Sequence, residues 1–66
     1  MNLLELDLRK YARESIKIKK INKTVYVYGS ELATLRILRI YRYHENARHG
    51  YSKKINSFYF ALVVDK

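Results

Sequence analysis

The sequence contains no cysteine, no proline and no tryptophan, and only two of its 66 residues are glycine. Without cysteine the chain has no disulfide framework, no thiolate metal site and no cysteine nucleophile. A chain of this length forms one small domain, here residues 1–66, with a modest hydrophobic core. Because the usual staples of such small proteins are missing, we expect a homodimer or a stabilising partner.

Long apolar runs are also absent. The longest uncharged stretch covers residues 55–64, whereas a membrane helix needs about 18 or more apolar residues. The first residues do not show a basic segment followed by an apolar run, so no signal peptide is expected. We therefore expect a cytoplasmic protein that does not contact a membrane.

Acidic residues are few, with 6 Asp and Glu against 14 Lys and Arg, which gives a formal net charge of +8. Hydrophobic residues make up 48% of the chain, so it is not a disordered basic tail. The charge is concentrated in residues 9–28, with seven basic residues and one acidic residue, and in residues 36–54, with six and one. Two basic blocks in a folded chain indicate a positive surface, which favours nucleic acid as the partner.

The first fourteen residues contain an amphipathic helical pattern. Apolar and small residues recur at the spacing of one helical face, at Leu4, Leu8, Tyr11, Ala12 and Ser15. Asn2 and Glu5 have the spacing of a capping box. We predict a helix over residues 2–14, with Leu3 and Leu6 outside its apolar face as a second contact surface.

Residues 15–28 predict a β-hairpin, because isoleucine alternates with lysine before residues 22–23 and β-branched and aromatic residues follow. A two-residue turn at residues 22–23 pairs residue 20 with 25, 18 with 27 and 17 with 28. One face of the hairpin then carries Ile16, Ile18, Val25 and Val27. The opposite face carries Lys17, Lys19, Tyr26 and Tyr28.

Residues 31–44 fit a helix that is capped by Ser30, although their β-branched and aromatic content leaves a strand open. As a helix, the segment directs Ala33, Ile37, Ile40 and Tyr41 to the core. Its basic residues then form a stripe, Arg36, Arg39 and Arg42. Residues 45–52 are expected to form a polar loop around Gly50.

Residues 53–64 predict a central strand, because a strand formed by these residues is apolar on both faces. We therefore expect a small α+β domain in the order helix–strand–strand–helix–strand, with both helices on one face of a short antiparallel sheet. The alternative is one helix packed on a four-stranded antiparallel sheet.

Three groups of residues are candidate sites. The hairpin face, which we expect Tyr59 to extend, interleaves cations with aromatic rings, as single-stranded nucleic acid requires for phosphate neutralisation and base stacking. The arginine stripe is spaced to contact successive phosphates or an acidic groove on a partner. With the second basic block, the candidate binding residues are Lys17, Lys19, Tyr26, Tyr28, Arg36, Arg39, Arg42, Arg48, Lys53 and Lys54.

The third group contains the two histidines. His44 and His49 are five residues apart, whereas the metal-binding H-E-x-x-H helix needs a spacing of four. Together with Glu45, Arg48 and Tyr51 they could serve a metal-independent ribonuclease as acid, base and phosphate clamp. Neither reading is favoured over ordinary loop residues, so we expect no catalytic residues, no metal and no cofactor.

The leading interpretation is a non-catalytic protein that binds nucleic acid, DNA or RNA, or a nucleoprotein complex. The alternative is a small inhibitor or adaptor of the kind that phages and mobile elements encode, which docks on a host protein through tyrosine and arginine hot spots. The chain's richness in Ile, Lys, Asn and Tyr, which have AT-rich codons, agrees with such an origin. A ribonuclease toxin is the least favoured reading.

Overall fold

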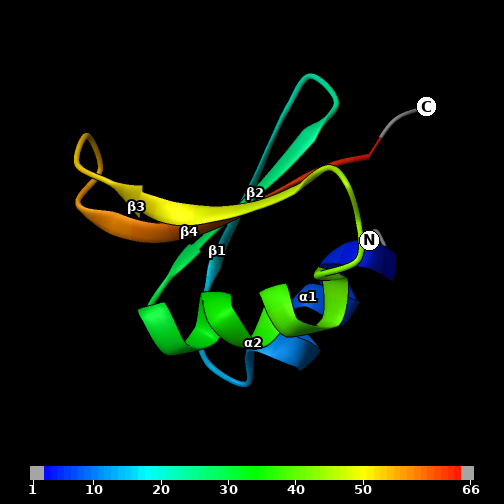
Figure 1. The fold of residues 1–66 in the computed structure, drawn as a ribbon. Helices are drawn as coiled ribbons and strands as arrows, with labels where there is room; N and C mark the ends of the chain where they lie inside the picture. The colour runs from blue at the N-terminus through cyan, green and yellow to red at the C-terminus, as the bar shows by residue number, and fades with distance from the viewer. Residues whose placement is uncertain (1–2, 65–66) are drawn as a thin grey trace.

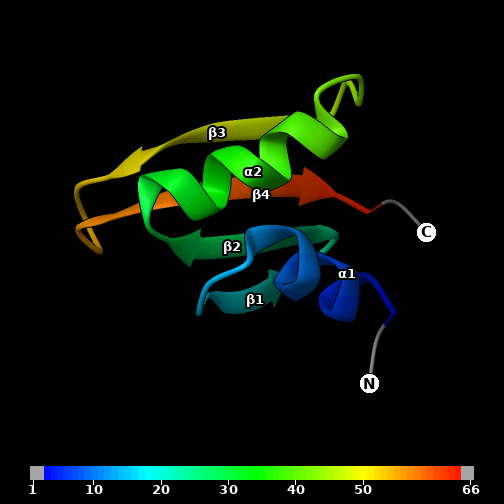
Figure 2. The ribbon, with the colours of Figure 1, turned by 90° about the horizontal axis from the view of Figure 1, so that it is seen from below.

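The structure is a computed structural model that describes residues 3–64. Its elements are α1 (Leu3–Ala12), β1 (Lys17–Ile21), β2 (Thr24–Gly29), α2 (Glu31–Tyr41), β3 (Ala47–Ser52) and β4 (Ser57–Val63). The strands form one antiparallel sheet in the order β1-β2-β4-β3, and both helices cover the same face of it (Figures 1 and 2). The α+β fold is confirmed, and β4 is central, but the sheet has one strand more than expected.

The β1–β2 hairpin has the predicted register. Lys17 pairs with Tyr28, and Lys20 pairs with Val25. Asn22 opens the turn with a φ of 56°, a left-handed conformation that asparagine tolerates better than most residues. This register directs Val25 and Val27 to the helices, where both are buried.

Residues 31–41 are helical, so the alternative of a strand in this segment is wrong. The Ser30 hydroxyl accepts a hydrogen bond from the Ala33 amide at 3.1 Å and caps the helix. Ile37 is fully buried, but Ile40 is 52% exposed and does not belong to the core as expected. Ile40 follows the buried Ile37 by three residues, a rotation of about 300° around the helix axis. Its side chain therefore points about 60° away from that of Ile37, at the edge of the buried face.

The prediction of a polar loop over residues 45–52 is wrong, because residues 47–52 form β3 and pair with β4 along their whole length. Residues 53–56 form the turn between them, so β4 begins at Ser57 and not at residue 53. Ile55 is therefore exposed in a turn. Polar residues are tolerated in β3 because it is an edge strand that is only partly covered.

The core lies between the helices and the sheet. Its largest fully buried side chains are Phe60, Leu8, Ile37 and Val27, together with the polar Thr34. Leu4 and Tyr11 pack against this cluster as predicted for the first helix, whereas Leu3 and Leu6 are exposed. The capping-box residue Asn2 lies outside the described residues. No helix within residues 3–64 is long and apolar enough to cross a membrane.

Candidate functional site

The face of the sheet that the helices leave uncovered carries alternate residues of all four strands. Across this face the register aligns Lys17 with Tyr28 and Tyr59 in one row. The next row aligns Lys19 with Tyr26, Ala61 and Arg48. We call this surface the open face, and define it by Lys17, Lys19, Tyr26, Tyr28, Arg48, Tyr59 and Ala61.

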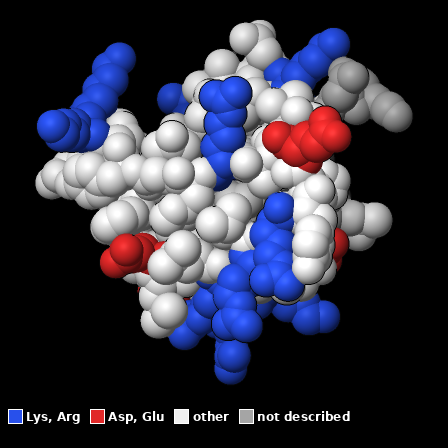
Figure 3. Space-filling model, in the orientation of Figure 1, with Lys and Arg blue, Asp and Glu red and all other residues white. Residues whose placement is uncertain are grey.

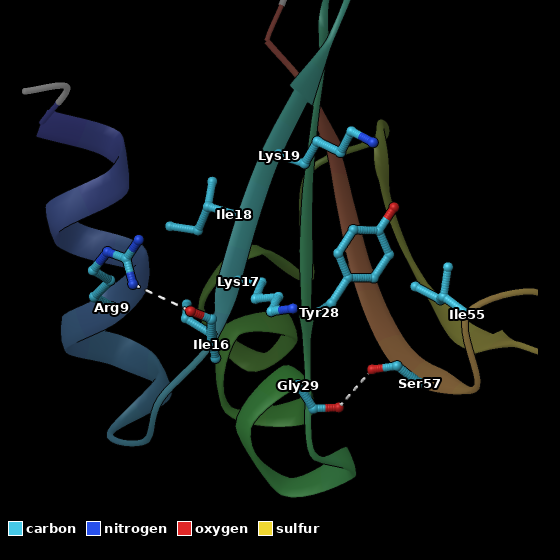
Figure 4. Close-up of a pocket in the computed structure, with 9 residues that line it drawn as sticks. All are labelled: Arg9, Ile16, Lys17, Ile18, Lys19, Tyr28, Gly29, Ile55 and Ser57. Carbon is cyan, nitrogen blue, oxygen red and sulfur yellow. Dashed lines mark hydrogen bonds between the residues drawn. The ribbon is translucent and has the colours of Figure 1, made fainter.

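The two tyrosines of β2 form the centre of the open face. Their rings are parallel, with 3° between the ring planes and 6.1 Å between the ring centroids. Both side chains are half-buried, while Lys17 and Lys19 opposite them are exposed. Figure 4 shows Lys19 and Tyr28 on one side of the hairpin and Ile18 on the other side, toward α1. The alternation predicted from the sequence therefore places cations and aromatic rings together on one accessible surface.

Tyr59 extends this aromatic surface toward β3 because Gly50 leaves room for its ring. A Cβ atom at Gly50 would lie 3.1 Å from the Tyr59 hydroxyl oxygen and 3.2 Å from two of its ring carbons. The ring thus lies across the backbone of β3, where any other residue would displace it. Tyr59 could be anticipated from the sequence, whereas the role of Gly50 depends on the pairing of β3 with β4.

A groove follows β4 across the open face. Its lining includes Tyr26 and Tyr28 on one side, Asn46 and Arg48 on the other, and Ala61 on β4 between them. The small Ala61 side chain keeps the groove open. Ala61 and Asn46 were missed in the sequence analysis, since only the register reveals that they face the same groove.

The charge of the open face is positive. None of the acidic residues within residues 3–64 lies in a strand, and no ion pair is found for Lys17, Lys19 or Arg48 among these residues. Lys53 and Lys54 are exposed in the turn between β3 and β4, at one end of the sheet (Figure 1). Their place allows them to extend the positive surface, although they do not line the groove.

The arginine stripe lies on α2, in the other layer of the molecule, and its members have different partners. Arg36 donates to the carbonyl oxygen of Ala12 at 3.0 Å and forms an ion pair with Glu14 at 3.3 Å. Arg42 donates to the Tyr43 hydroxyl and lies 4.8 Å from the centre of that ring. Arg36 is thus engaged within the fold, and the stripe does not join the open face.

The two histidines lie in different surroundings. His44 lies in the loop after α2, with its ring 5.7 Å from that of Tyr41. The ring of His49 lies on the helix side of β3, with Nε2 2.8 Å from the buried Thr34 hydroxyl, while the adjacent Arg48 belongs to the open face. The residues considered for a ribonuclease are therefore split between two faces of the sheet. Residues 3–64 contain no group of three or more potential His, Cys, Asp or Glu metal ligands.

Comparison with known proteins finds no matching family model, no matching curated protein and no matching solved structure. The function must therefore be argued from the surface of the molecule itself.

Proposed function

We propose that the protein binds single-stranded nucleic acid on the open face without catalysing a reaction. The observation that carries this proposal is the parallel pair Tyr26 and Tyr28 with a lysine directly opposite each ring. Aromatic side chains on a sheet stack on bases, and neighbouring cations neutralise the phosphates. A cytoplasmic location, as expected from the sequence, agrees with such a ligand.

The groove along β4 supplies the second element of a binding surface. A strand that crosses the sheet meets rings on β2 and β4, and the cations Lys19 and Arg48 stand at opposite ends of one row of paired residues. This arrangement accepts any base, because every base has a π-face that can stack. We therefore expect weak sequence preference.

The test is the affinity for a labelled oligonucleotide near physiological ionic strength, measured by fluorescence anisotropy. Replacing Tyr26 and Tyr28 together by alanine is expected to weaken binding by about 2–6 kcal/mol, which is about 30-fold or more, because each stacked base contributes about 1–3 kcal/mol. The same two positions changed to phenylalanine retain the rings and should retain the affinity. Tyr51→Ala is the matched control, since Tyr51 is 46% exposed and lies outside the open face.

Two outcomes would contradict the proposal. The first is a folded Tyr26→Ala, Tyr28→Ala variant, verified by circular dichroism, that binds as tightly as the unaltered protein. The second is unfolding of this variant, which would show that the two rings stabilise the domain instead of forming a binding platform. A salt titration supplies an independent check, because Lys17→Gln and Lys19→Gln should each reduce the slope of log K against log salt by about 0.7.

A further inference from the structure

A second positive surface lies on the helical layer, across the molecule from the open face. We propose that the groove between α1 and α2 binds the phosphate backbone of a second nucleic-acid segment, so that one molecule joins two segments, one on each layer. This inference rests on the proposed function for the first of the two sites. It adds a separate site with its own residues.

The groove is lined by five basic residues and only two others. From α1 and its end come Lys10, Tyr11 and Arg13, and from α2 and its end come Arg36, Arg39, Ile40 and Arg42. Basic side chains gather over the helices in the lower half of the space-filling view (Figure 3). The positive surface therefore combines residues from both helices and is not limited to the arginine stripe.

Most of these basic residues form no ion pair with another residue of the described part of the chain. The carboxylate of Glu14 forms an ion pair with Arg36, but no ion pair is found for Lys10, Arg13, Arg39 or Arg42 among the described residues. Cations that share one groove repel each other, so bringing them together costs free energy unless an anion binds there. The arrangement is thus more readily explained as an anion site than as a solvated helix face.

The chemistry of the groove favours phosphodiesters. Four of its five cations are arginines, whose planar guanidinium groups donate two parallel hydrogen bonds to a phosphate. Arg39 and Arg42 are three residues apart on one helix, a rise of about 4.5 Å, so they present two successive donors along the groove. A phosphate chain supplies repeating acceptors for such a row.

Two sites on opposite layers have a consequence that one site lacks. The molecule measures 29 × 24 × 23 Å, and an oligonucleotide shorter than the path around it cannot occupy both layers. Two such oligonucleotides must then bind on opposite faces of one protein molecule. The protein is expected to act as a connector of strands.

The experiment uses two short, non-complementary oligonucleotides, one with a donor dye and one with an acceptor dye, near physiological ionic strength. With the unaltered protein, energy transfer should rise with protein concentration, pass a maximum and fall when excess protein separates the two oligonucleotides. A groove variant with Lys10→Gln, Arg39→Gln and Arg42→Gln should keep its affinity for a single oligonucleotide. Its affinity for the second should fall about 50-fold at about 0.15 M salt, from three lost phosphate contacts with a slope of about 0.7 each.

The design leaves Arg36 and Arg13 unchanged, because Arg36 holds the end of α1 and Arg13 has a φ of 60° at that end. A variant with Lys20→Gln and Lys23→Gln removes two positive charges from the exposed end of the hairpin, outside both the groove and the open face, and should still bridge. Unchanged energy transfer in the groove variant would overturn the proposal, and would point to a homodimer with one site in each subunit. Failure of the first site is recognised separately, when adding Tyr26→Ala and Tyr28→Ala to the groove variant leaves its binding of a single oligonucleotide unchanged.

A membrane surface is the competing occupant of the groove. Co-sedimentation with vesicles of phosphatidylserine and phosphatidylcholine separates the two ligands. Vesicle binding that depends on the groove residues, with bridging unaffected, would overturn the assignment to nucleic acid. Bridging that depends on the groove residues, with no vesicle binding, supports it.

Discussion

Arg36 links the two helices, and its replacement by glutamine is expected to lower the stability of the domain. Its guanidinium donates to the Ala12 carbonyl at the end of α1 and pairs with Glu14. The other carboxylate oxygen of Glu14 accepts from the Ser30 hydroxyl at 2.9 Å, and this hydroxyl in turn caps α2 at Ala33. One chain of hydrogen bonds thus runs from the end of the first helix to the beginning of the second.

The magnitude follows from the exposure of the two charged groups. A hydrogen bond from a charged donor contributes about 1.5–3 kcal/mol, and an exposed ion pair about 0.2–1 kcal/mol. The side chains of Arg36 and Glu14 are 31% and 37% exposed, so solvent screens both interactions and values near the lower ends apply. We expect Arg36→Gln to cost about 2 kcal/mol. For a domain of this size that is a decrease in Tm of about 8–16 °C.

Thermal unfolding followed by circular dichroism measures this effect, and Arg39→Gln is the matched control. Arg39 is an exposed arginine of the same helix, so its replacement should change stability by about 0.5 kcal/mol or less. Glu14→Gln alone and in combination with Arg36→Gln completes a double-mutant cycle, with an expected coupling of about 0.2–0.5 kcal/mol between Arg36 and Glu14. Equal stability of Arg36→Gln and Arg39→Gln would refute the structural role of Arg36 and return it to the candidates for phosphate binding.

Two further predictions concern aromatic residues. Gly50→Ala places a Cβ atom 3.1 Å from the Tyr59 hydroxyl oxygen, so the Tyr59 ring should move. We expect changed NMR chemical shifts of the Tyr59 ring protons. Unchanged shifts would contradict the close approach of this ring to Gly50. Burial raises the pKa of Tyr41, with smaller contributions from nearby Tyr11 and Asp7. As the pH rises, the Tyr41 hydroxyl therefore loses its proton at a lower pH in the unfolded chain than in the folded protein. The free energy of unfolding should then fall as the pH rises above the usual tyrosine pKa of about 10. Tyr41→Phe should make that fall less steep in alkaline denaturation curves, and an unchanged slope would show that Tyr41 does not contribute to it.

The hairpin and its two faces could be predicted from the sequence because their signal is local. Alternation at Ile16 to Ile18 and at Val25 to Val27 specifies which side chains face the helices, and a one-residue shift would bury lysine. The same register places Tyr26 on the open face. Local pattern and burial agree here, so no knowledge of distant residues was needed.

The third strand could not be predicted in this way. Residues 47–52 contain little apolar character, and their strand conformation depends on pairing with β4, which supplies the hydrogen-bond partners. Gly50 looks like a loop residue, yet it lies inside the strand where the Tyr59 ring needs space. Ile55 looks like a strand residue, yet it belongs to the turn. For β3 and for Gly50 the deciding interaction comes from another segment, β4.

The arginine stripe shows the same limit for function. Helical periodicity places Arg36, Arg39 and Arg42 on one side of α2, but it gives each the same environment. The end of α1 then approaches Arg36 and supplies a carbonyl and a carboxylate, so this residue stabilises the fold. The same helix brings Lys10 beside Arg39 and Arg42, and no ion pair is found for these three among the described residues. Packing of α1 therefore divides the stripe into one arginine that stabilises the fold, Arg36, and two that line a cationic groove, Arg39 and Arg42.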